Sequence, residues 1–263
     1  MASVFVVPRR SVLKIGIGLA GLPLLGGCSS QPAGNQPVSS KGSKGVVGVS
    51  VLTLTNPFFK VIGDNITAEL KKAGYDTIVV SGDKDIATQQ RQVRDFVVRK
   101  AAAIVLCPCD SRAIGPVIVE ANQAGIPVFT CDIASLADTG KVVSHIATDN
   151  YGGGKLAAEA MIEALGPAGG DIVILDFRSA ESCLERVRGF KEVLGAHNAS
   201  RETGKINIVA ELPGEGAQDR GYAAAEDALT AHPDLAGIFA INDPSALGAR
   251  QALEKAGKAD QVK

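Results

Sequence analysis

From Val46 onward the chain alternates short apolar, β-branched runs with longer amphipathic segments, and this alternation limits the possible folds more than any other feature. The first run, 46–54, predicts a buried strand, and Pro57 begins a segment in which Ile62, Ile66 and Leu70 recur at the spacing of one helix face. Near-continuous apolar strands separated by helices are typical of parallel sheets covered on both faces. The pattern therefore predicts an α/β protein.

Two rounds of this alternation follow one another along the chain. In the first round, further strands are predicted at 77–80, 103–107, 127–131 and 142–148, with a helix after Asp85 and another at 111–124. The second round predicts helices at 151–165, 182–195, 219–231 and 244–256 and strands at 171–176, 206–212 and 236–241. Two successive units of about 100 residues predict two similar doubly wound parallel-sheet lobes, 46–148 and 149–263, with a hinge near 147–150.

The first 28 residues are typical of a bacterial export signal. Arg9, Arg10 and Lys14 precede an apolar run over 15–27, which as a helix spans about 20 Å and is short for a hydrocarbon core of about 30 Å. Leu25-Gly26-Gly27-Cys28 resembles the lipobox of bacterial lipoproteins, in which the cysteine receives diacylglycerol, and the arginine pair resembles a twin-arginine signal. The alternative is an uncleaved anchor helix with a chance cysteine.

The composition narrows the function classes. Residues 29–45 are rich in Ser, Gly and Pro, which predicts a flexible linker without a core of its own. The chain beyond the signal segment is mildly acidic, so it has no bulk electrostatic attraction for nucleic acid. Aromatic residues make up 4% of the chain and Trp is absent, so an aromatic side chain in a predicted binding loop is informative.

Several short motifs stand at the predicted strand ends, where α/β proteins bind ligands. They are Asn56-Pro57-Phe58-Phe59, Cys131-Asp132, Arg186 with Gly189-Phe190, and Asn242-Asp243-Pro244. In their order and spacing these motifs resemble the ribose-type sugar-binding proteins that feed bacterial ABC importers, and the resemblance runs from about Val46 to Lys263. It implies a fold like that of type I periplasmic binding proteins.

The resemblance also implies a function and a location. It implies a solute-binding lipoprotein, exported to the periplasm or cell surface, that captures a small polar ligand such as a monosaccharide or its derivative. Its partners are this ligand and an ABC permease, it meets the membrane only through its lipid anchor, and it acts as a monomer without a cofactor. Two alternatives remain open, a ligand-sensing receptor partner and a truncated product with impaired binding.

A sugar-binding site needs hydrogen-bonding groups for the hydroxyls at the ring edge and aromatic walls for the ring faces. The residue types at the predicted strand ends meet both needs, and the resemblance implies the same positions: Asn56, Phe58, Phe59, Asp132, Arg186 and Asn242. Each has a plainer interpretation, because the two phenylalanines suit a helix core, the arginine a solvated helix, and Asp132 and Asn242 a turn or cap.

Three further ligand-binding positions depart from the ribose pattern. Cys107 stands where that pattern has an amide, Ile133 where it has a guanidinium, and Gln218 where it has an aromatic wall. These departures predict a ligand other than ribose itself, either a less hydroxylated or modified sugar or another small polar molecule. The family pattern also continues past the position of Lys263, so the last segments are expected to be missing and strand edges in both lobes to lack partners.

The remaining cysteines and glycines offer weaker signals. Cys131 and either Cys107 or Cys109 suit a disulfide in an oxidising compartment, and buried free thiols are the alternative. No cysteine or histidine spacing indicates a metal site, and no nucleophile–base pair indicates catalytic residues or an enzyme. Gly152-Gly153-Gly154-Lys155 lacks the Ser or Thr that completes a phosphate loop and predicts a helix entry instead.

We predict that Cys28 becomes the lipid-bearing N-terminus of the mature protein. Because two acyl chains anchor a protein far better than one, a Cys28→Ala variant should be found as soluble or unprocessed protein on membrane fractionation. Normal processing and membrane retention of this variant would contradict the prediction.

Overall fold

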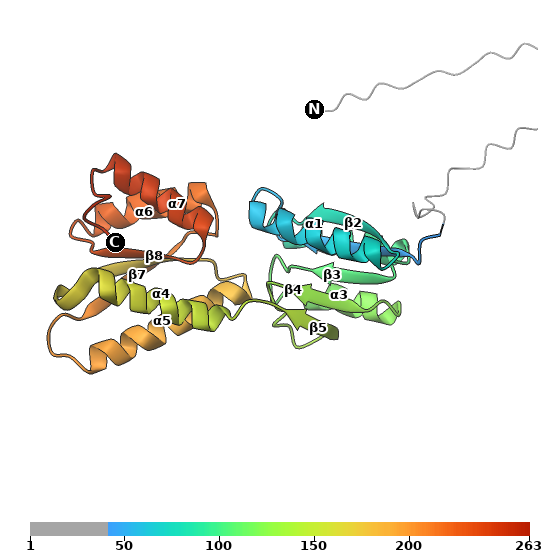
Figure 1. Ribbon diagram of the computed structural model, residues 1–263, viewed down its shortest axis with the longest axis horizontal. Helices are drawn as coiled ribbons and strands as arrows, with labels where there is room; N and C mark the ends of the chain where they lie inside the picture. The colour runs from blue at the N-terminus through green and yellow to red at the C-terminus, as the bar shows by residue number, and fades with distance from the viewer. Residues whose placement is uncertain (1–41) are drawn as a thin grey trace, which may run out of the picture. The chain divides into compact units, whose positions relative to one another are not determined.

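The computed structural model describes residues 42–263, all of which lie in one unit of the chain, Pro37–Lys263. The predicted signal segment with Cys28, and the predicted linker up to residue 41, lie outside the described residues. In chain order the elements are β1 (Val46–Val51), α1 (Pro57–Lys72), β2 (Asp76–Ser81), α2 (Ile86–Val98), β3 (Ala103–Leu106), α3 (Gly115–Gln123), β4 (Val128–Cys131), β5 (Val142–Ile146), α4 (Asn150–Leu165), the 3-10 helix η1 (Gly166–Ala168), β6 (Gly170–Asp176), α5 (Glu181–Ala199), β7 (Ile206–Pro213), α6 (Gln218–Ala231), β8 (Gly237–Ala240) and α7 (Asp243–Lys255) (Figure 1).

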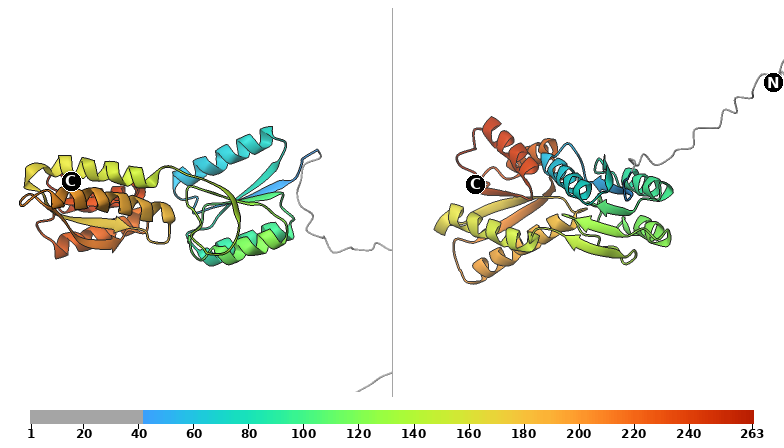
Figure 2. Two further views of the ribbon diagram at one scale, coloured as in Figure 1. Left: turned by 90° about the horizontal axis from the view of Figure 1, so that it is seen from below. Right: turned by 45° about the vertical axis from the view of Figure 1, so that its right-hand side comes forward.

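The first sheet has five parallel strands in the order β2-β1-β3-β4-β5. Different helices cover its two faces (Figure 2). On one face Val47, Val49 and Val51 of β1 pack with Phe59 of α1. On the other face, residues of β3 and β4 pack with α2 and α3, and this core comprises Val93, Phe96, Ile104, Leu106, Val117, Ile118 and Val128.

The second sheet has three parallel strands in the order β7-β6-β8. The alternation of side chains along β6 assigns its helices to two faces. Ile172 and Ile174 belong to the core that contains residues of α4 and α5, whereas Val173 and Leu175 pack with residues of α6 and α7. Both sheets are therefore doubly wound and parallel, and the predicted α/β class is confirmed.

Several element boundaries differ from the sequence-based expectation, and two of the differences have a clear physical cause. The third helix begins at Gly115 rather than at residue 111, because Asp110 Oδ1 accepts hydrogen bonds from the backbone N–H groups of Arg112 and Ala113, both at 2.8 Å, and holds a turn there. The predicted linker ends before residue 45, because Lys44 N–H donates to Gly74 O at 2.8 Å and so joins the sheet's first loop.

One face of the first sheet is less covered than the sequence predicted. Helix α1 packs over β1 and β2, and α2 and α3 both lie on the opposite face, so among the described residues no helix covers the α1 side of β4 and β5. Ile146 is 73% exposed there. A groove of about 500 Å³ results, hereafter the β4–β5 groove, whose lining includes Ile62, Ile66, Val105, Phe129, Cys131 and Ile146.

The sequence predicted that strand edges in both lobes lack hydrogen-bond partners, and the edge strands of the two sheets can be compared with this prediction. Strand β5 forms one edge of the first sheet and β8 one edge of the second. Beside β8, however, Lys263 N–H donates to Ala236 O at 2.9 Å and Ile238 N–H donates to Lys263 O at 2.7 Å. The outer edge of β8 is thus hydrogen-bonded in part.

No helix among the described residues has the length and apolar character needed to cross a membrane.

A single buried serine joins loops that follow the two sheets. Ser111 N–H donates to Ser179 O at 2.9 Å, and the Ser111 hydroxyl accepts a 2.9 Å bond from the N–H of Glu181 at the start of α5. Ser111 O also accepts from Leu136 N–H at 2.7 Å. These bonds place the loop after β3 against the loop after β6, which brings the carboxyl ends of the two sheets toward the same region.

Gln89 connects α2 to β1 and to the loop that follows β3. Its Nε2 donates to Cys107 O at 3.0 Å and to Ser50 Oγ at 3.2 Å, and its Oε1 accepts from Cys109 N–H at 2.7 Å. Gln89 is fully buried. Its loss would therefore leave buried backbone groups without partners.

We expect Gln89→Ala to lower the free energy of unfolding by about 2–4 kcal/mol, because each buried donor or acceptor left unpaired costs about 1–3 kcal/mol. Urea denaturation measures this change. The matched control is Gln90→Ala, whose side chain bonds Ala113 O in an exposed setting and which should change stability by less than about 1 kcal/mol. Equal effects of the two substitutions would show that the Gln89 bonds are not needed.

Candidate functional site

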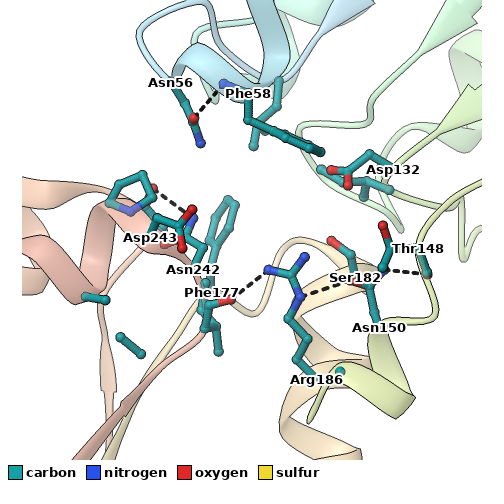
Figure 3. A pocket seen from close by; sticks show the side chains of 18 of the residues that line it. Asn56, Phe58, Asp132, Thr148, Asn150, Phe177, Ser182, Arg186, Asn242 and Asp243 are labelled. Atoms are coloured by element: carbon teal, nitrogen blue, oxygen red, sulfur yellow. Dashed lines mark hydrogen bonds between the residues drawn. The ribbon is translucent and has the colours of Figure 1, made fainter. Parts of the chain in front are cut away.

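A cavity of about 470 Å³ lies beyond the carboxyl ends of strands from both sheets (Figure 3). This is the position at which open α/β sheets bind ligands, and the volume is that of small-molecule sites. Seven of the nine residues predicted from the sequence line it: Asn56, Phe58, Phe59, Asp132, Ile133, Arg186 and Asn242. The structure thus brings together side chains that are far apart in the sequence.

Asn56 has two tasks because it is also the N-cap of α1. Its Oδ1 accepts a 3.0 Å hydrogen bond from Phe58 N–H, and Pro57 occupies the first helical position, where a missing N–H costs nothing. The acceptor end of the amide is therefore used by the helix, whereas the NH₂ end faces the cavity (Figure 3). The amide group that Asn56 leaves free toward the cavity is therefore a hydrogen-bond donor.

The two adjacent phenylalanines occupy different environments. Phe59 is 5% exposed and packs in the core beneath α1, and Phe58 is 50% exposed. Their ring centroids are 5.3 Å apart with an interplanar angle of 78°, an edge-to-face pair. Both rings line the cavity. The buried ring holds the exposed one in place, so that Phe58 presents an apolar surface at modest entropic cost.

Asp132 is held by an unusual backbone conformation. Its φ of 62° lies in the left-handed region, which Asp tolerates better than most residues. Its N–H donates to Ile146 O at 2.9 Å, which ties the end of β4 to β5. The side chain is buried and points toward the cavity (Figure 3). Burial raises the pKa of this carboxyl, although the charge of Arg186 opposes the rise.

Arg186 in α5 is fixed by two other elements. Its Nε donates to Asn150 Oδ1 at 2.9 Å and one NH₂ group donates to Ile241 O at 2.7 Å. Asn150 in turn donates to Thr148 O at 3.1 Å. The second NH₂ group of the guanidinium points toward the cavity (Figure 3). Arg186 is therefore not a solvated helix residue but a positioned donor.

Asn242 lines the cavity and caps α7. Its Oδ1 accepts hydrogen bonds from the N–H and the hydroxyl of Ser245, the former at 3.2 Å, and its Nδ2 donates to Gly216 O at 3.3 Å. The cap interpretation of Asn242 is therefore correct, and its position in the cavity wall is compatible with the predicted ligand contact. Because its polar atoms bond within the protein, Asn242 shapes the cavity wall and orients the loop around Gly216.

Two of the predicted ligand-binding residues lie outside the cavity. Cys107 is fully buried, and its Sγ lies 3.3 Å from Cys131 Sγ, because it follows β3 directly and its side chain packs on the sheet face. Gln218 is the first residue of α6 and lines a neighbouring cavity with Asp219 and Tyr222. Of the three departures from the ribose pattern, only Ile133 stands in the cavity wall.

Sequence reasoning missed an aromatic wall and a cation. Phe177 directly follows β6, is 5% exposed and lines the cavity. Lys84, in the loop after β2, also lines it; its Nζ donates to Glu215 O at 2.8 Å and lies 5.7 Å from the centre of the Phe177 ring. Burial lowers the pKa of Lys84, against the charge of Asp219. The sequence predicted that the second lobe lacks an aromatic wall, because Gln218 replaces it. Phe177 provides an aromatic face from that lobe at a different position.

Polar residues near Arg186 were missed as well. Asn150 and Ser182, both buried, line the cavity beside the guanidinium. The signal that would have found Phe177 and Lys84 was present, since both follow strands whose ends were predicted. Asn150 and Ser182 carried no such signal, because each lies at or near a helix start, where polar residues are ordinary caps.

The cavity combines an acceptor, fixed donors and aromatic rings from the sides of both sheets. A ligand that carries hydroxyls at its edge and C–H groups on its faces satisfies this set. Among residues 42–263 no group of three or more His, Cys, Asp or Glu side chains is arranged to hold a metal ion.

Comparison with known proteins adds independent evidence. The family model described as periplasmic binding protein domain matches residues 47–263. The chain belongs to this family. It is 37% identical over 218 residues to the ribose import binding protein of Escherichia coli, an alignment that covers 83% of this chain and 71% of that relative. The predicted resemblance to ribose-type members is thereby confirmed.

Solved structures give the same result for the fold of this periplasmic binding protein. The Caulobacter myo-inositol binding protein bound to myo-inositol superimposes with a TM-score of 0.75 at 26% identity, over 84% of this chain and 74% of that one. An ABC transporter solute binding protein from Actinobacillus succinogenes 130z with bound D-allose gives a TM-score of 0.70 at 29% identity, over 83% and 77%.

The raised pKa of Asp132 predicts a pH-dependent stability effect in the ligand-free protein. A carboxyl with a higher pKa in the folded than in the unfolded state favours folding when protonated, and this contribution is lost as the pH rises through the folded-state pKa. Asp132→Asn keeps the shape, suits the left-handed backbone and removes the charge. We expect this variant to be more stable than the parent at pH 7, with a difference that disappears near pH 3.

Urea denaturation across this pH range measures the effect. The control is Asp138→Asn, which removes an exposed carboxylate from the same loop between β4 and β5 and should change stability by less than about 0.5 kcal/mol. A pH-independent difference, or a less stable Asp132→Asn protein at pH 7, would contradict the prediction.

Proposed function

We propose that this periplasmic binding protein captures a small polyhydroxylated ligand, a monosaccharide or a derivative, between its two sheets and delivers it to an ABC permease. The observation that carries the proposal is the cavity in which the Asp132 carboxylate and the Arg186 guanidinium face the same space as Phe58 and Phe177. Relatives that import ribose or D-apiose, and the solved relative with bound D-allose, support a sugar as the ligand.

In this proposal, different side chains of the cavity bind different parts of the ligand. Asp132 accepts hydrogen bonds from ligand hydroxyls, and Arg186 and Asn56 donate to ligand oxygens. Phe58 covers one apolar face of the ring and Phe177 another part of the ligand surface. Because Ile133 adds an apolar wall, a ligand that presents a methyl, methylene or deoxy position there leaves no hydroxyl unsatisfied, at a saving of about 1–3 kcal/mol over ribose.

Closure of the two lobes is the signal that we propose for the permease. Ligand contacts come from both sides of the predicted hinge at 147–150, with Asp132 before it and Arg186 after it. A ligand that bonds both favours the closed state by the difference between its affinities for the two states. The hydrogen bond from Lys84 Nζ to Glu215 O joins a loop before the hinge to a loop after it. This bond favours the closed state.

We further propose that the chain is exported and held at the membrane by a lipid on Cys28. The export signal and lipobox of the sequence support this proposal, as does membership of a family of periplasmic proteins. Its role is binding rather than catalysis, in line with the transport roles in the names of its relatives.

A thermal-shift screen of the purified protein against pentoses, hexoses, deoxy sugars, inositols and amino acids tests the proposal, followed by calorimetry on the best ligand. We expect a sugar or polyol to raise Tm. Asp132→Asn should weaken its binding about ten- to a hundredfold, because hydrogen bonds to a charged acceptor are worth about 1.5–3 kcal/mol. Phe58→Ala should also weaken binding, since half of this ring is exposed and its loss spares the core.

The matched control is Gln218→Ala, which changes a residue outside the cavity and should leave affinity within about twofold. The proposal is wrong if no polyhydroxylated compound shifts Tm. It is also wrong if the ligand binds Asp132→Asn as tightly as the parent, which would place the site elsewhere.

A further inference from the structure

Two cysteine side chains meet at the carboxyl ends of neighbouring strands. Leu106 of β3 pairs with Thr130 of β4 in the parallel register, so the next residues along, Cys107 and Cys131, are lateral neighbours. Their Sγ atoms are 3.3 Å apart. Adjacent strands lie about 4.8 Å apart, which is within the Cα separation that disulfides span. The two sulfurs therefore need only a small approach to bond.

The other described cysteines are placed differently. Cys109 Sγ faces Leu52 O at 3.8 Å, and burial raises the pKa of its thiol to about 12. Cys183 lies in α5, and burial raises the pKa of its thiol to about 12 as well. Both behave as buried, unreactive thiols. The geometry thus selects one of the two pairings that the sequence left open.

The two members of the pair differ in access and in acidity. Cys107 is fully buried, whereas Cys131 is half-buried and lines the β4–β5 groove beside Phe129 and Ile146. The Cys107 thiol donates to the Cys131 sulfur, which lowers the pKa of Cys131 and raises that of Cys107; burial and the charge of Asp132 oppose the lowering at Cys131. Cys131 is therefore the thiol that an external reagent meets first.

We propose that Cys107 and Cys131 form a dithiol site that a disulfide oxidant converts into a cross-strand disulfide. The Cys131 thiolate attacks one sulfur of the oxidant and forms a mixed disulfide, releasing one thiol. Cys107 then loses its proton and attacks the Cys131 sulfur, which forms the Cys107–Cys131 bond and releases the second thiol. In total the protein loses two protons and two electrons, and the oxidant is reduced to two thiols.

The bond ties the ends of β3 and β4 together next to Asp132. It closes a loop of chain that contains α3, and such a crosslink restricts the unfolded chain more than the folded one. We therefore expect oxidation to raise Tm by about 5 °C or more. Exported proteins meet disulfide oxidants in the compartment predicted for this chain. The site is independent of the sugar-binding proposal, because its formation requires no ligand.

Peptide mapping tests the site on the folded full-length chain carrying Cys28→Ser, so that this thiol does not interfere. The protein is incubated with oxidised glutathione, its free thiols are alkylated, and it is digested without reduction. We expect a peptide pair joined through Cys107 and Cys131 and two hydrogen atoms lighter than its reduced parts, with a higher Tm that dithiothreitol reverses. Linkage through Cys109 or Cys183, or full alkylation of Cys107 and Cys131, would overturn the proposal.

Single variants test the order of attack. In Cys107→Ala the mixed disulfide cannot be resolved, so Cys131 should retain glutathione. In Cys131→Ala the remaining Cys107 should stay unmodified. The controls Cys109→Ala and Cys183→Ala should still form the bond. Glutathione on Cys107 in the Cys131→Ala protein would overturn the assignment of Cys131 as the attacking thiol.

Discussion

The C-terminal half of the site depends on a close backbone contact between α4 and α5. A Cβ atom at Gly154 would lie 2.0 Å from Arg186 O, and one at Gly189 would lie 2.1 Å from Tyr151 O. Only glycine permits such an approach. It brings Arg186 within reach of Asn150 at the start of α4 and of Ile241 O after β8. Within the Gly152-Gly153-Gly154 run, Gly154 is thus explained by helix packing, whereas a Cβ at Gly153 would meet no atom within 4 Å.

The two halves of the site use the same device to hold an asparagine. Asn56 and Asn242 each follow a strand, each cap the next helix through Oδ1, and each stand near a proline in the first turn of that helix. The helix fixes the side chain, and the side chain fixes the helix start. Their free ends differ in use, since Asn56 faces the cavity whereas Asn242 bonds Gly216 O. Such positioning before a ligand arrives reduces the entropy lost on binding.

Much of the fold follows from local sequence pattern, because strand burial and helix amphipathicity are local properties. The strand ends then indicated Asn56, Asp132 and Asn242. What the pattern did not show was side-chain direction and loop proximity. Cys107 packs on the sheet face instead of entering the cavity. Phe177 stands at a predicted strand end, but its contact with Lys84 depends on the loops after β2 and β6 coming together, which local pattern does not record.

Local pattern likewise did not show that, among residues 42–263, no helix covers the β4–β5 groove. Periodicity shows that a strand is apolar, but not which neighbouring helix will cover it. The helices that follow β2 and β3 both cross to the same face, and this choice depends on the handedness of the crossovers and on sheet order. Ile146 is exposed as a result of that topology rather than of its own sequence context.

The left-handed backbone at Asp132 restricts which side chains can occupy this position in the cavity wall. At a φ of 62° few side chains other than Asp, Asn and Gly are accommodated without strain. Glutamate or glutamine, which would reshape the cavity with similar chemistry, are disfavoured by the main chain itself. Substitutions that change this wall without backbone strain are therefore those at positions of ordinary backbone conformation. Ile133, the next residue and one of the departures from the ribose pattern, is such a position.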